Sequence, residues 1–296
     1  MALTKGANLG VDFTGGTTIT VSTNENVTLN SLKEEIKNSN YNIKKEEKTK
    51  SSITITIKEV LNNDEIKELS NTIEDKYNTN TDIYTVSKIV KQELTKNAFY
   101  SLILASIGIL IYIKVRFKFN YAIASIVALV HDSLMIILFF CIFKLEINSL
   151  FIAAILTIIG YSINDTIVTF DMIRENYQKL LNSKQKKKKK EIIQEEIKEE
   201  ELIEIVNNSV RITFFRSILT TLTTIFPVIC LMVLGSREII NFNIALFVGF
   251  IAGVYSSIYI SNQIWLMLEI KSIKKPKKDN IDDDELNELE IKGVNC

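Results

Sequence analysis

The sequence predicts an α-helical polytopic membrane protein with five transmembrane helices and an N-terminal α+β domain of the ferredoxin-like class. Polar, lysine-rich residues run from Lys5 to Lys96, and mainly apolar residues follow from Ala98. The polar part alternates between strand and helix periods, whereas the apolar part contains five segments long enough to cross a bilayer. Only two prolines occur in 296 residues, which favours long helices over many loops.

Residues 10–96 are predicted to form one βαββαβ domain. The predicted strands are Thr18–Ser22, Tyr41–Glu47, Ser52–Lys58 and Thr81–Val86, the third having the clearest alternation of isoleucine and threonine. Amphipathic helices are predicted at Leu29–Asn38, capped by Thr28, and at Ile66–Tyr77, capped by Asn63 or Asp64. This order is that of a ferredoxin-like sandwich, in which both helices cover one face of the sheet.

Helical character begins at Lys88 and continues into the membrane without a turn signal. The five predicted spans are Ala98–Ile113, Tyr121–Phe143, Ile147–Phe170, Phe214–Leu234 and Phe242–Leu268. Three spans therefore fall within residues 97–177 and two within residues 213–270. Residues 178–212, rich in lysine and glutamate, are expected to be a mobile or helical loop. Residues 1–9 are interpreted as a short remnant and residues 271–296 as a tail.

The lysines and arginines predict the orientation in the plasma membrane. If the five segments alternate in direction, one side collects most of them: Lys114, Arg116, Lys118, Arg174, Lys184–Lys190 and Lys271–Lys278. The opposite side has only Lys144 and Arg237 in its loops. We therefore expect the loop 178–212 and the C-terminus to be cytoplasmic and the N-terminal domain to be extracytoplasmic. The net charge of +0 gives no argument for a nucleic-acid partner.

Polar side chains interrupt the apolar spans at three places. His131 and Asp132 lie in the second span, Asn164 and Asp165 in the third, and Arg216 early in the fourth. Ionisable residues within a membrane are costly and usually have a function. Alternative interpretations are a mutually satisfied His–Asp pair at a helix contact and an arginine that snorkels to the interface. Serines and threonines that follow Arg216 are better explained by helix packing and bonding to their own backbone.

Asp165 is harder to explain structurally because a short carboxylate cannot snorkel far. It lies about 9 Å inside the exit of its span at about 1.5 Å per residue, and Arg216 lies at a similar depth on the helix that returns. We therefore expect Asp165 and Arg216 to form one titrating ion pair. Tyr161 and Thr169, one turn on either side of Asp165, are candidates to donate hydrogen bonds.

Three motifs stand out: GVDFTGGT at residues 10–17, ALVHD at residues 128–132 and GYSINDTIVTFDMIREN at residues 160–176. They resemble motifs of the SecF proteins of the SecD/SecF family, within the resistance-nodulation-division superfamily. The last two spans also resemble the family, in NNSVRITFFRSILTTLTT at residues 207–224 and VGFIAGVYSSIYIS at residues 248–261. The signature residues are Gly10, Asp12, Phe13, Gly15, Gly16, Gly160, Tyr161, Asp171, Arg174 and Glu175.

The resemblance implies a function in protein export. Proteins of this family work with SecD and the small protein YajC beside the SecYEG channel, and they use the proton-motive force to pull an unfolded polypeptide outward. The family's functional aspartate and arginine fall on Asp165 and Arg216, and its His-Asp pair falls on His131 and Asp132. Asn164 belongs to the same polar group.

The sequence departs from the family pattern in two ways. The family normally has six spans, and its first precedes the LGVDFTGG motif, where only residues 1–8 stand here. The Gly-Pro element that usually leads into the second span has no counterpart in Ile83–Val90, so the hinge there is expected to behave differently.

Two other functions fit parts of the pattern. One is a lipid or small-molecule transporter of the same superfamily. The single extracytoplasmic domain is, however, too small to enclose a substrate channel alone. The other is an intramembrane aspartyl protease that uses Asp132 and Asp165, neither of which has a Gly-x-Gly-Asp context. There is no glycine-rich phosphate loop and no metal-ligand spacing of cysteines, so we predict no ATP use, cofactor, metal or enzymatic activity.

Overall fold

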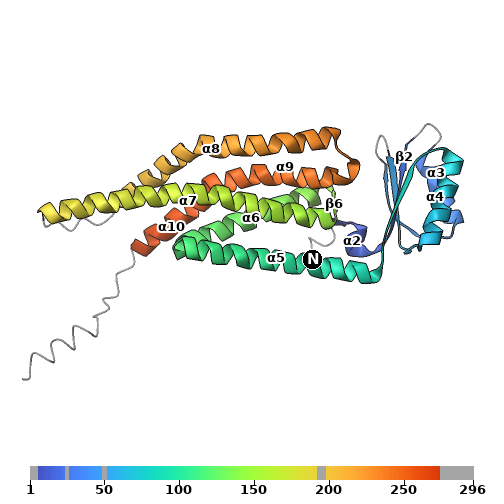
Figure 1. Cartoon of the computed structure of the whole chain (residues 1–296), viewed down its shortest axis with the longest axis horizontal. Coiled ribbons are helices and arrows are strands. Elements are labelled where there is room, and N and C mark those ends of the chain that lie inside the picture. Colours follow the sequence, from blue (N-terminus) through green and yellow to red (C-terminus); the bar gives the residue numbers. More distant parts are fainter. Residues whose placement is uncertain (1–5, 24–26, 49–51, 192–197, 274–296) are drawn as a thin grey trace, which may run out of the picture.

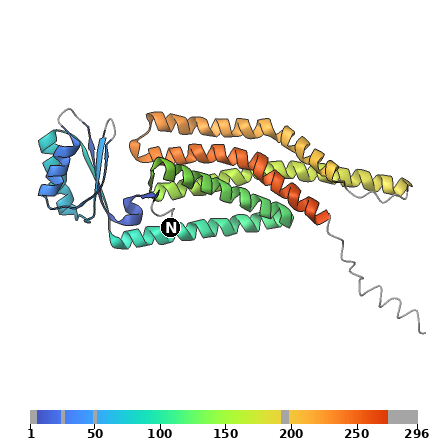
Figure 2. The ribbon, with the colours of Figure 1, turned by 180° about the vertical axis from the view of Figure 1, so that it is seen from behind.

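The computed structural model describes residues 6–23, 27–48, 52–191 and 198–273. It is an elongated molecule in which a small α/β sandwich stands at one end of a bundle of long helices (Figure 1). The sandwich sheet faces the bundle, and its two helices lie on the far side (Figure 2). Both the sandwich and the five-helix membrane part confirm the predicted fold class.

The sandwich consists of a four-stranded antiparallel sheet and two helices. Its strands are β2 (Gly16–Ser22), β3 (Ile43–Lys48), β4 (Ser52–Ile57) and β5 (Thr81–Val86), in the order β3-β4-β2-β5, and its helices are α3 (Leu29–Asn38) and α4 (Asn63–Tyr77). Alternate strand residues, such as Ile19 and Ile55, pack against Leu32 and Ile73 of the helices. This topology is ferredoxin-like, as predicted.

Both sandwich helices begin at capping boxes. Thr28 caps α3 as predicted, because its hydroxyl accepts a hydrogen bond from Ser31 N. The cap of α4 is Asn62, and not Asn63 or Asp64 as predicted. Its Oδ1 accepts from the backbone of residues 64 and 65, and the Glu65 carboxylate accepts from Asn62 N in return. This reciprocal bonding favours Asn62 over its neighbours.

An unpredicted joint connects the sandwich to the bundle. Strand β1 (Asn8–Leu9) pairs in parallel with β6 (Glu146–Ile147), which lies between two bundle helices. A short helix, α2 (Val11–Thr14), then leads into β2 through Gly15 and Gly16, both of which have positive φ angles of 73° and 121°. A Cβ atom on Gly16 would lie 2.3 Å from Ile57 O, so this turn requires glycine.

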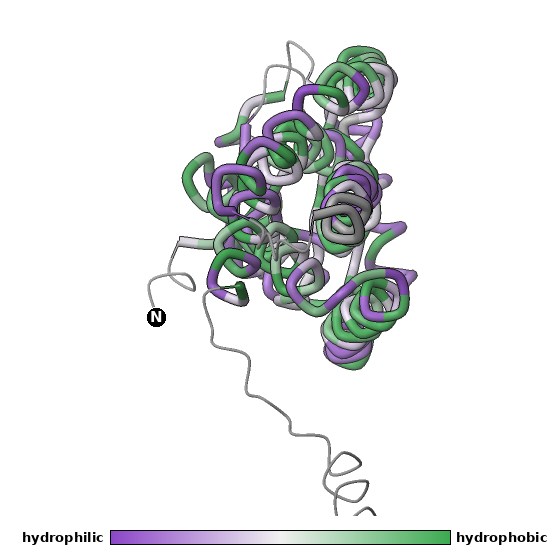
Figure 3. Tube along the Cα trace, turned by 90° about the vertical axis from the view of Figure 1, so that its left-hand side faces the viewer, coloured by the Kyte–Doolittle hydropathy of each residue, from purple (hydrophilic) through white to green (hydrophobic). Residues whose placement is uncertain are grey.

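Within the described residues, the bundle contains five helices long and apolar enough to cross a membrane, which confirms the predicted number. They are α5 (Lys88–Arg116), α6 (Phe119–Phe143), α7 (Ser149–Glu191), α8 (Glu199–Leu234), and a fifth made of α9 (Ile240–Tyr255), the π-helical turn η2 (Ser256–Ile260) and α10 (Ser261–Ile273). A 3₁₀ turn, η1 (Arg237–Ile239), precedes α9. Viewed along the bundle, apolar residues recur on every helix (Figure 3).

The charged segment 178–212 is mainly helical in the described residues. Helix α7 extends through it to Glu191, and α8 begins at Glu199. Lys184 Nζ of α7 lies 2.6 Å from Glu201 Oε2 of α8, and Leu202 and Val206 of α8 are buried. The apolar contacts explain why the start of α8 is ordered helix despite its charged composition.

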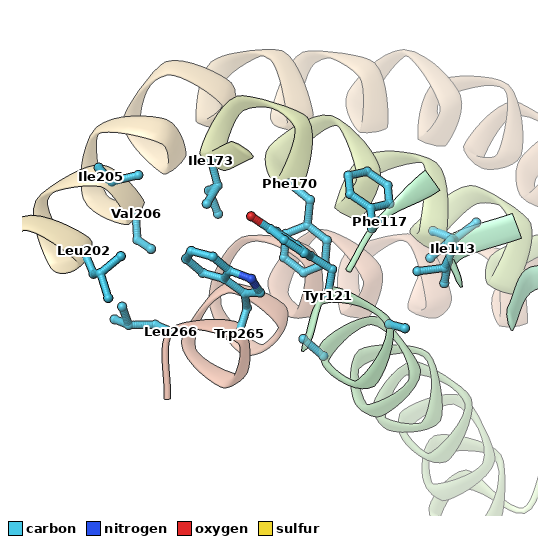
Figure 4. Close-up of a cluster of buried hydrophobic side chains, with 13 residues drawn as sticks. Ile113, Phe117, Tyr121, Phe170, Ile173, Leu202, Ile205, Val206, Trp265 and Leu266 are labelled. Atoms are coloured by element: carbon cyan, nitrogen blue, oxygen red, sulfur yellow. The ribbon is translucent and has the colours of Figure 1, made fainter. Parts of the chain in front are cut away.

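Burial differs strongly among the helices. The fifth helix and α7 are the most buried, whereas α5 is peripheral and exposes large apolar side chains such as Leu104 and Val115. Far from the sandwich, an aromatic cluster joins α6, α7 and α10 (Figure 4). Tyr121 stacks on Trp265 with ring centroids 4.9 Å apart and meets the edge of Phe170 at 5.0 Å. This cluster fixes the helices that carry the polar residues.

Candidate functional site: two buried carboxylates

The first carboxylate belongs to Asp132 on α6 and is fully buried. Its Oδ2 accepts hydrogen bonds from Ser162 Oγ of α7 at 2.6 Å and from Ser256 Oγ of η2 at 2.8 Å. Its Oδ1 lies 3.1 Å from His131 Nδ1, so the two residues interact as the paired interpretation expects. Gly253 permits the close helix approach, because a Cβ there would lie 3.3 Å from Ser162 Cβ.

The second carboxylate belongs to Asp165 on α7, which is only 9% exposed. Its Oδ1 accepts a hydrogen bond from Ser217 Oγ of α8 at 2.7 Å, and its Oδ2 accepts one from Ser257 Oγ of η2 at 2.7 Å. Each carboxylate is therefore held by one serine from a neighbouring helix and one serine from η2. Hydroxyl donors satisfy a buried carboxylate without adding a charge.

The turn η2 brings the two carboxylate sites together. Its consecutive residues Ser256 and Ser257 bond to Asp132 and Asp165, respectively. Asn262 stabilises the turn, because its side-chain amide donates to Ser257 O at 3.1 Å and to Ile258 O at 2.7 Å. A π-helical turn leaves backbone carbonyls without their usual helical partners, and such turns are frequent at functional sites.

The predicted ion pair between Asp165 and Arg216 is not formed. Among the described residues no ion pair includes Arg216, and its side chain is exposed on the outer side of α8. The next residue, Ser217, is fully buried and takes the position that Arg216 was expected to fill. Consecutive residues of a helix point about 100° apart, so at one depth only one of them can face α7.

The other predicted neighbours of Asp165 have different partners. Tyr161 bonds to Thr221 Oγ1 at 3.2 Å and accepts from Thr224 at 3.4 Å, both on α8. Thr169 Oγ1 donates to the backbone carbonyl of Asp165 at 3.4 Å and does not contact its carboxylate. Asn164 is exposed and points away from the site. The backbone bonding expected of the threonines on α8 is present at Thr220, which donates to Arg216 O.

An apolar groove of about 770 Å³ lies beside the first carboxylate. It runs between α6 and α9 and is lined by apolar side chains such as Phe139, Phe247 and Ile251, with His131 and Tyr255 also lining it. The rings of His131 and Tyr255 lie 6.0 Å apart. His131 therefore stands between the groove and the buried carboxylate of Asp132.

The signature residues at the start of the chain form the joint. Asp12 is buried, and its Oδ2 accepts from Ser149 N at 2.7 Å and from Ser149 Oγ at 2.6 Å, at the first residue of α7. Its Oδ1 accepts from Tyr84 Oη of β5 at 3.2 Å. Desolvation raises the pKa of Tyr84, and the negative charge of Asp12 and this hydrogen bond add to the rise, so the phenol stays a neutral donor.

The remaining signature residues do not touch the carboxylates. Phe13 packs against the bundle core, and Gly10 allows Glu146 to approach, since a Cβ there would lie 2.6 Å from its Oε1. Arg116 Nη2 bonds both oxygens of Asp171 at 3.0 and 3.1 Å, and Arg174 Nη1 donates to Arg116 O. Glu175 pairs with Lys179 one turn later, and Gly160 is exposed.

Sequence reasoning identified both aspartates but missed three of the four serines that hold them. These are Ser162, Ser256 and Ser257, each inside an apolar run. Ser217 is one of the serines and threonines after Arg216 that the sequence alone attributes to helix packing. The available signal was a pair of adjacent serines within a span that is otherwise apolar around them.

Comparison with known proteins identifies the family of the chain. The model described as protein export membrane protein SecD/SecF, C-terminal, matches residues 65–271, and the SecD/SecF GG motif matches residues 2–27. The protein translocase subunit SecF of Sebaldella termitidis is 37% identical over 282 residues, which cover 93% of this chain and 86% of that protein. The SecF of Pseudomonas aeruginosa is 31% identical over 288 residues, which cover 95% of this chain and 89% of that protein.

A longer relative and a solved structure show the same family relationship. The protein translocase subunit SecDF of Bacillus subtilis is 40% identical over 272 residues, which cover 90% of this chain and 35% of that protein. The crystal structure of SecDF, a translocon-associated membrane protein from Thermus thermophilus, superposes with a TM-score of 0.75 at 29% identity. The match covers 90% of this chain and 35% of the Thermus SecDF chain. This chain therefore spans about a third of the length of its SecDF relatives.

Proposed function

Since this chain belongs to the SecD/SecF family of protein export membrane proteins, we propose that it is a SecF-like subunit of the Sec translocase that couples the proton-motive force to late-stage protein export. The observation that carries the proposal is Asp165, a carboxylate buried in a membrane-spanning helix and held only by neutral hydroxyl donors in the described residues. A carboxyl group placed in a span at such cost is expected to have a function.

The hydroxyl surroundings suit a group that gains and loses a proton. A serine hydroxyl donates to an ionised carboxylate and can accept from a protonated one. A guanidinium can only donate, so an arginine in the place of Ser217 would favour the charged form. Asp165 can therefore gain or lose a proton without leaving a buried cation unpaired.

The exposed position of Arg216 favours the presence of a partner subunit of the SecD type. It lies on the outer face of α8 with Thr220 and Thr223, one and two turns later, among exposed apolar side chains such as Phe215 and Leu219. A polar stripe that includes an arginine is costly against lipid and favours contact with another membrane helix. The partner would supply the carboxylate that pairs with Arg216, and SecYEG and YajC complete the proposed assembly.

The orientation follows the distribution of basic residues. The sandwich is placed outside the cytoplasm, where it binds or guides the unfolded exported polypeptide, and the C-terminus and the 178–212 segment are cytoplasmic. The proposed role is mechanical and requires no cofactor and no covalent chemistry, so it is not enzymatic. The lone transporter and the protease remain the alternatives.

The test replaces Asp165 by asparagine, which keeps the shape and removes the titrating group. Export is followed in membrane vesicles after ATP is removed, with and without an imposed proton gradient. Asp165→Asn should assemble normally and lose the stimulation by the gradient. The matched control is Thr157→Ala, since Thr157 is exposed on the same helix and its hydroxyl donates only to Ala153 O.

Two results would contradict the proposal. One is a full response of Asp165→Asn vesicles to the gradient. The other is purification of the native complex from membranes without a SecD-type subunit, which would favour the lone transporter or the protease instead.

A further inference from the structure

Ser256 and Ser257 differ from the other carboxylate-binding serines in having a second acceptor within reach. Ser256 Oγ lies 2.8 Å from Asp132 Oδ2 and 3.2 Å from Gly253 O, three residues earlier in the fifth helix. Ser257 Oγ lies 2.7 Å from Asp165 Oδ2 and 3.2 Å from Val254 O. Each hydroxyl can therefore donate its hydrogen bond either to a carboxylate or to a backbone carbonyl.

Ser162 and Ser217 have no such choice among the described contacts. Ser162 Oγ donates to Asp132 alone, and Ser217 Oγ donates to Asp165 alone. They are fixed donors, whereas the two serines of η2 can turn. All four serines are fully buried, so water does not offer the hydroxyls an alternative partner.

The two acceptors correspond to the two protonation states of each carboxyl group. When the aspartate is ionised, the serine hydrogen points to the carboxylate, which is the stronger, charge-assisted acceptor. When the aspartate takes up a proton, its O–H donates to the serine oxygen, and the serine hydrogen turns to the backbone carbonyl. No hydroxyl is left without an acceptor in either state, which avoids the cost of a buried unpaired donor.

We propose that Ser256 and Ser257 are positioning residues that link the protonation of Asp132 to that of Asp165. They are consecutive residues of one turn, and Asn262 fixes that turn from the next part of the helix. Because the two serines are adjacent, a shift of the η2 backbone that follows protonation of one carboxyl group also moves the donor of the other. One further titratable group faces the pair, His131, whose Nδ1 lies 3.1 Å from Asp132 Oδ1. The inference deepens the proposed function, because it makes Asp132 and Asp165 one coupled pair of proton acceptors.

The test measures proton binding directly and does not depend on export. The full chain in liposomes is titrated by infrared spectroscopy, which reports the C=O stretch of protonated carboxyl groups. Asp132→Asn and Asp165→Asn assign the two bands. The coupling is the change in the titration midpoint of Asp165 when Asp132 is replaced by asparagine, measured with and without the serines.

We expect Asp132→Asn to move the midpoint of Asp165 by about one pH unit, a tenfold change in the proton dissociation constant, when both serines are present. In the Ser256→Ala/Ser257→Ala background the same replacement should move it by about one third of that or less, as a double-mutant cycle measures. Ser256→Thr/Ser257→Thr, which keeps the hydroxyls, should restore the full coupling. If the double alanine chain does not fold, Ser257→Ala alone serves the same comparison.

Ser125→Ala is the control, because Ser125 is a buried serine of α6 whose hydroxyl donates only to Tyr121 O. It should leave the coupling unchanged. An equal midpoint shift with and without the serines would overturn the proposal, since direct repulsion between the carboxylates would then account for the coupling. Absence of any shift in the unmodified chain would also overturn it. A failure of the proposed export function would leave both measurements valid.

Discussion

At the residue scale, each of the two buried carboxylates is held by two serine hydroxyls, which carry no charge. A hydrogen bond to an ionised group contributes about 1.5–3 kcal/mol, so two hydroxyls offset much of the cost of burying one carboxylate. Asp165 receives two such bonds, and Asp132 receives two on one oxygen with His131 beside the other. The Asp165 carboxylate thus has hydrogen-bond donors for both of its oxygens without a neighbouring cation among the described residues.

The sequence was sufficient to predict which acids lie within the membrane-spanning helices, but not what they touch. Spacing along a helix gives the depth of a residue in the membrane, and on depth alone Arg216 and Ser217 are almost equivalent. Which of them faces α7 depends on the rotation of α8 about its axis. That rotation is set by packing of the whole helix. On α8, Ser209, Thr213, Ser217 and Thr221 recur every four residues along the buried face, a pattern that indicates the rotation only when the whole helix is considered.

A pH-dependent contact in the sandwich can be tested at the same scale. Glu59 accepts from Asn42 N at 3.0 Å and from Asn42 Nδ2 at 2.7 Å. Desolvation raises the pKa of the Glu59 carboxyl, but these hydrogen bonds and Lys58 outweigh it and lower the pKa overall. The folded-state pKa is therefore below the unfolded-state value, so the contact stabilises the fold above the unfolded value and the contribution disappears as pH falls through the folded value.

Glu59→Gln should accordingly reduce the hydrogen-exchange protection of β3 and β4 at neutral pH. The difference from the unmodified chain should vanish below the folded-state pKa, after correction for intrinsic exchange. The effect is expected to be small because Glu59 is partly exposed and solvent screens its charge. A difference that persists unchanged at low pH would show that shape, and not charge, governs this contact.

At the element scale, the π-helical turn η2 is the least predictable part of the chain and the centre of the site. Its sequence, SSIYI, has no proline or glycine that would mark an interruption. Long apolar helices and alternating strands were predictable because their periods extend over many residues. The single turn of altered winding is stabilised instead by side chains just beyond it in the same helix. The Asn262 amide donates to Ser257 O and Ile258 O, and Ser261 Oγ donates to Ser257 O.

Replacing Asn262 by leucine tests this explanation. The change keeps a similar volume and removes the donors to Ser257 O and Ile258 O, at a cost of about 1–3 kcal/mol for two net hydrogen bonds. Mass-spectrometric hydrogen exchange should show faster exchange in residues 255–262 than in the unmodified chain. The matched control is Asn243→Leu on α9, because Asn243 is equally buried and its amide has no hydrogen-bond partner among the described residues. Asn243→Leu should leave exchange in residues 255–262 unchanged. An equal loss of protection in both variants would contradict the role given to Asn262.

At the scale of the whole molecule, the helix that carries Asp165 is also the helix that the sandwich joint caps. Asp12 satisfies the first backbone N–H of α7 from a distant segment and bonds to Tyr84 of the sheet. A carboxylate at a helix N-terminus is favoured by the helix dipole. Lys45 of β3 adds a contact to Glu146 of β6 at 3.4 Å. The family motif at the start of the chain thus fastens the sandwich to α7.

Asp12→Ala should loosen this joint while both folded parts persist. Loss of a cap costs about 0.5–2 kcal/mol, so exchange should accelerate at the first turn of α7 and around Tyr84. Asp12→Asn, which keeps an acceptor but loses the charge, should have an intermediate effect. The control is Asp82→Ala, an exposed acid on the neighbouring stretch of β5. Unchanged exchange at residues 149–152 in Asp12→Ala would contradict the capping role.

The way in which the sandwich is attached limits how it can move. Its two connections to the bundle leave from β2 and β5, which are hydrogen-bonded neighbours, with Gly16 directly opposite Val86. Only Ser87 separates β5 from α5, and Gly15 alone separates α2 from β2. Because the two short connections lie side by side, we expect the sandwich to tilt more easily about the line that joins them than to twist against the bundle. The contacts of Asp12 with Ser149 and of Lys45 with Glu146 would then oppose that tilt.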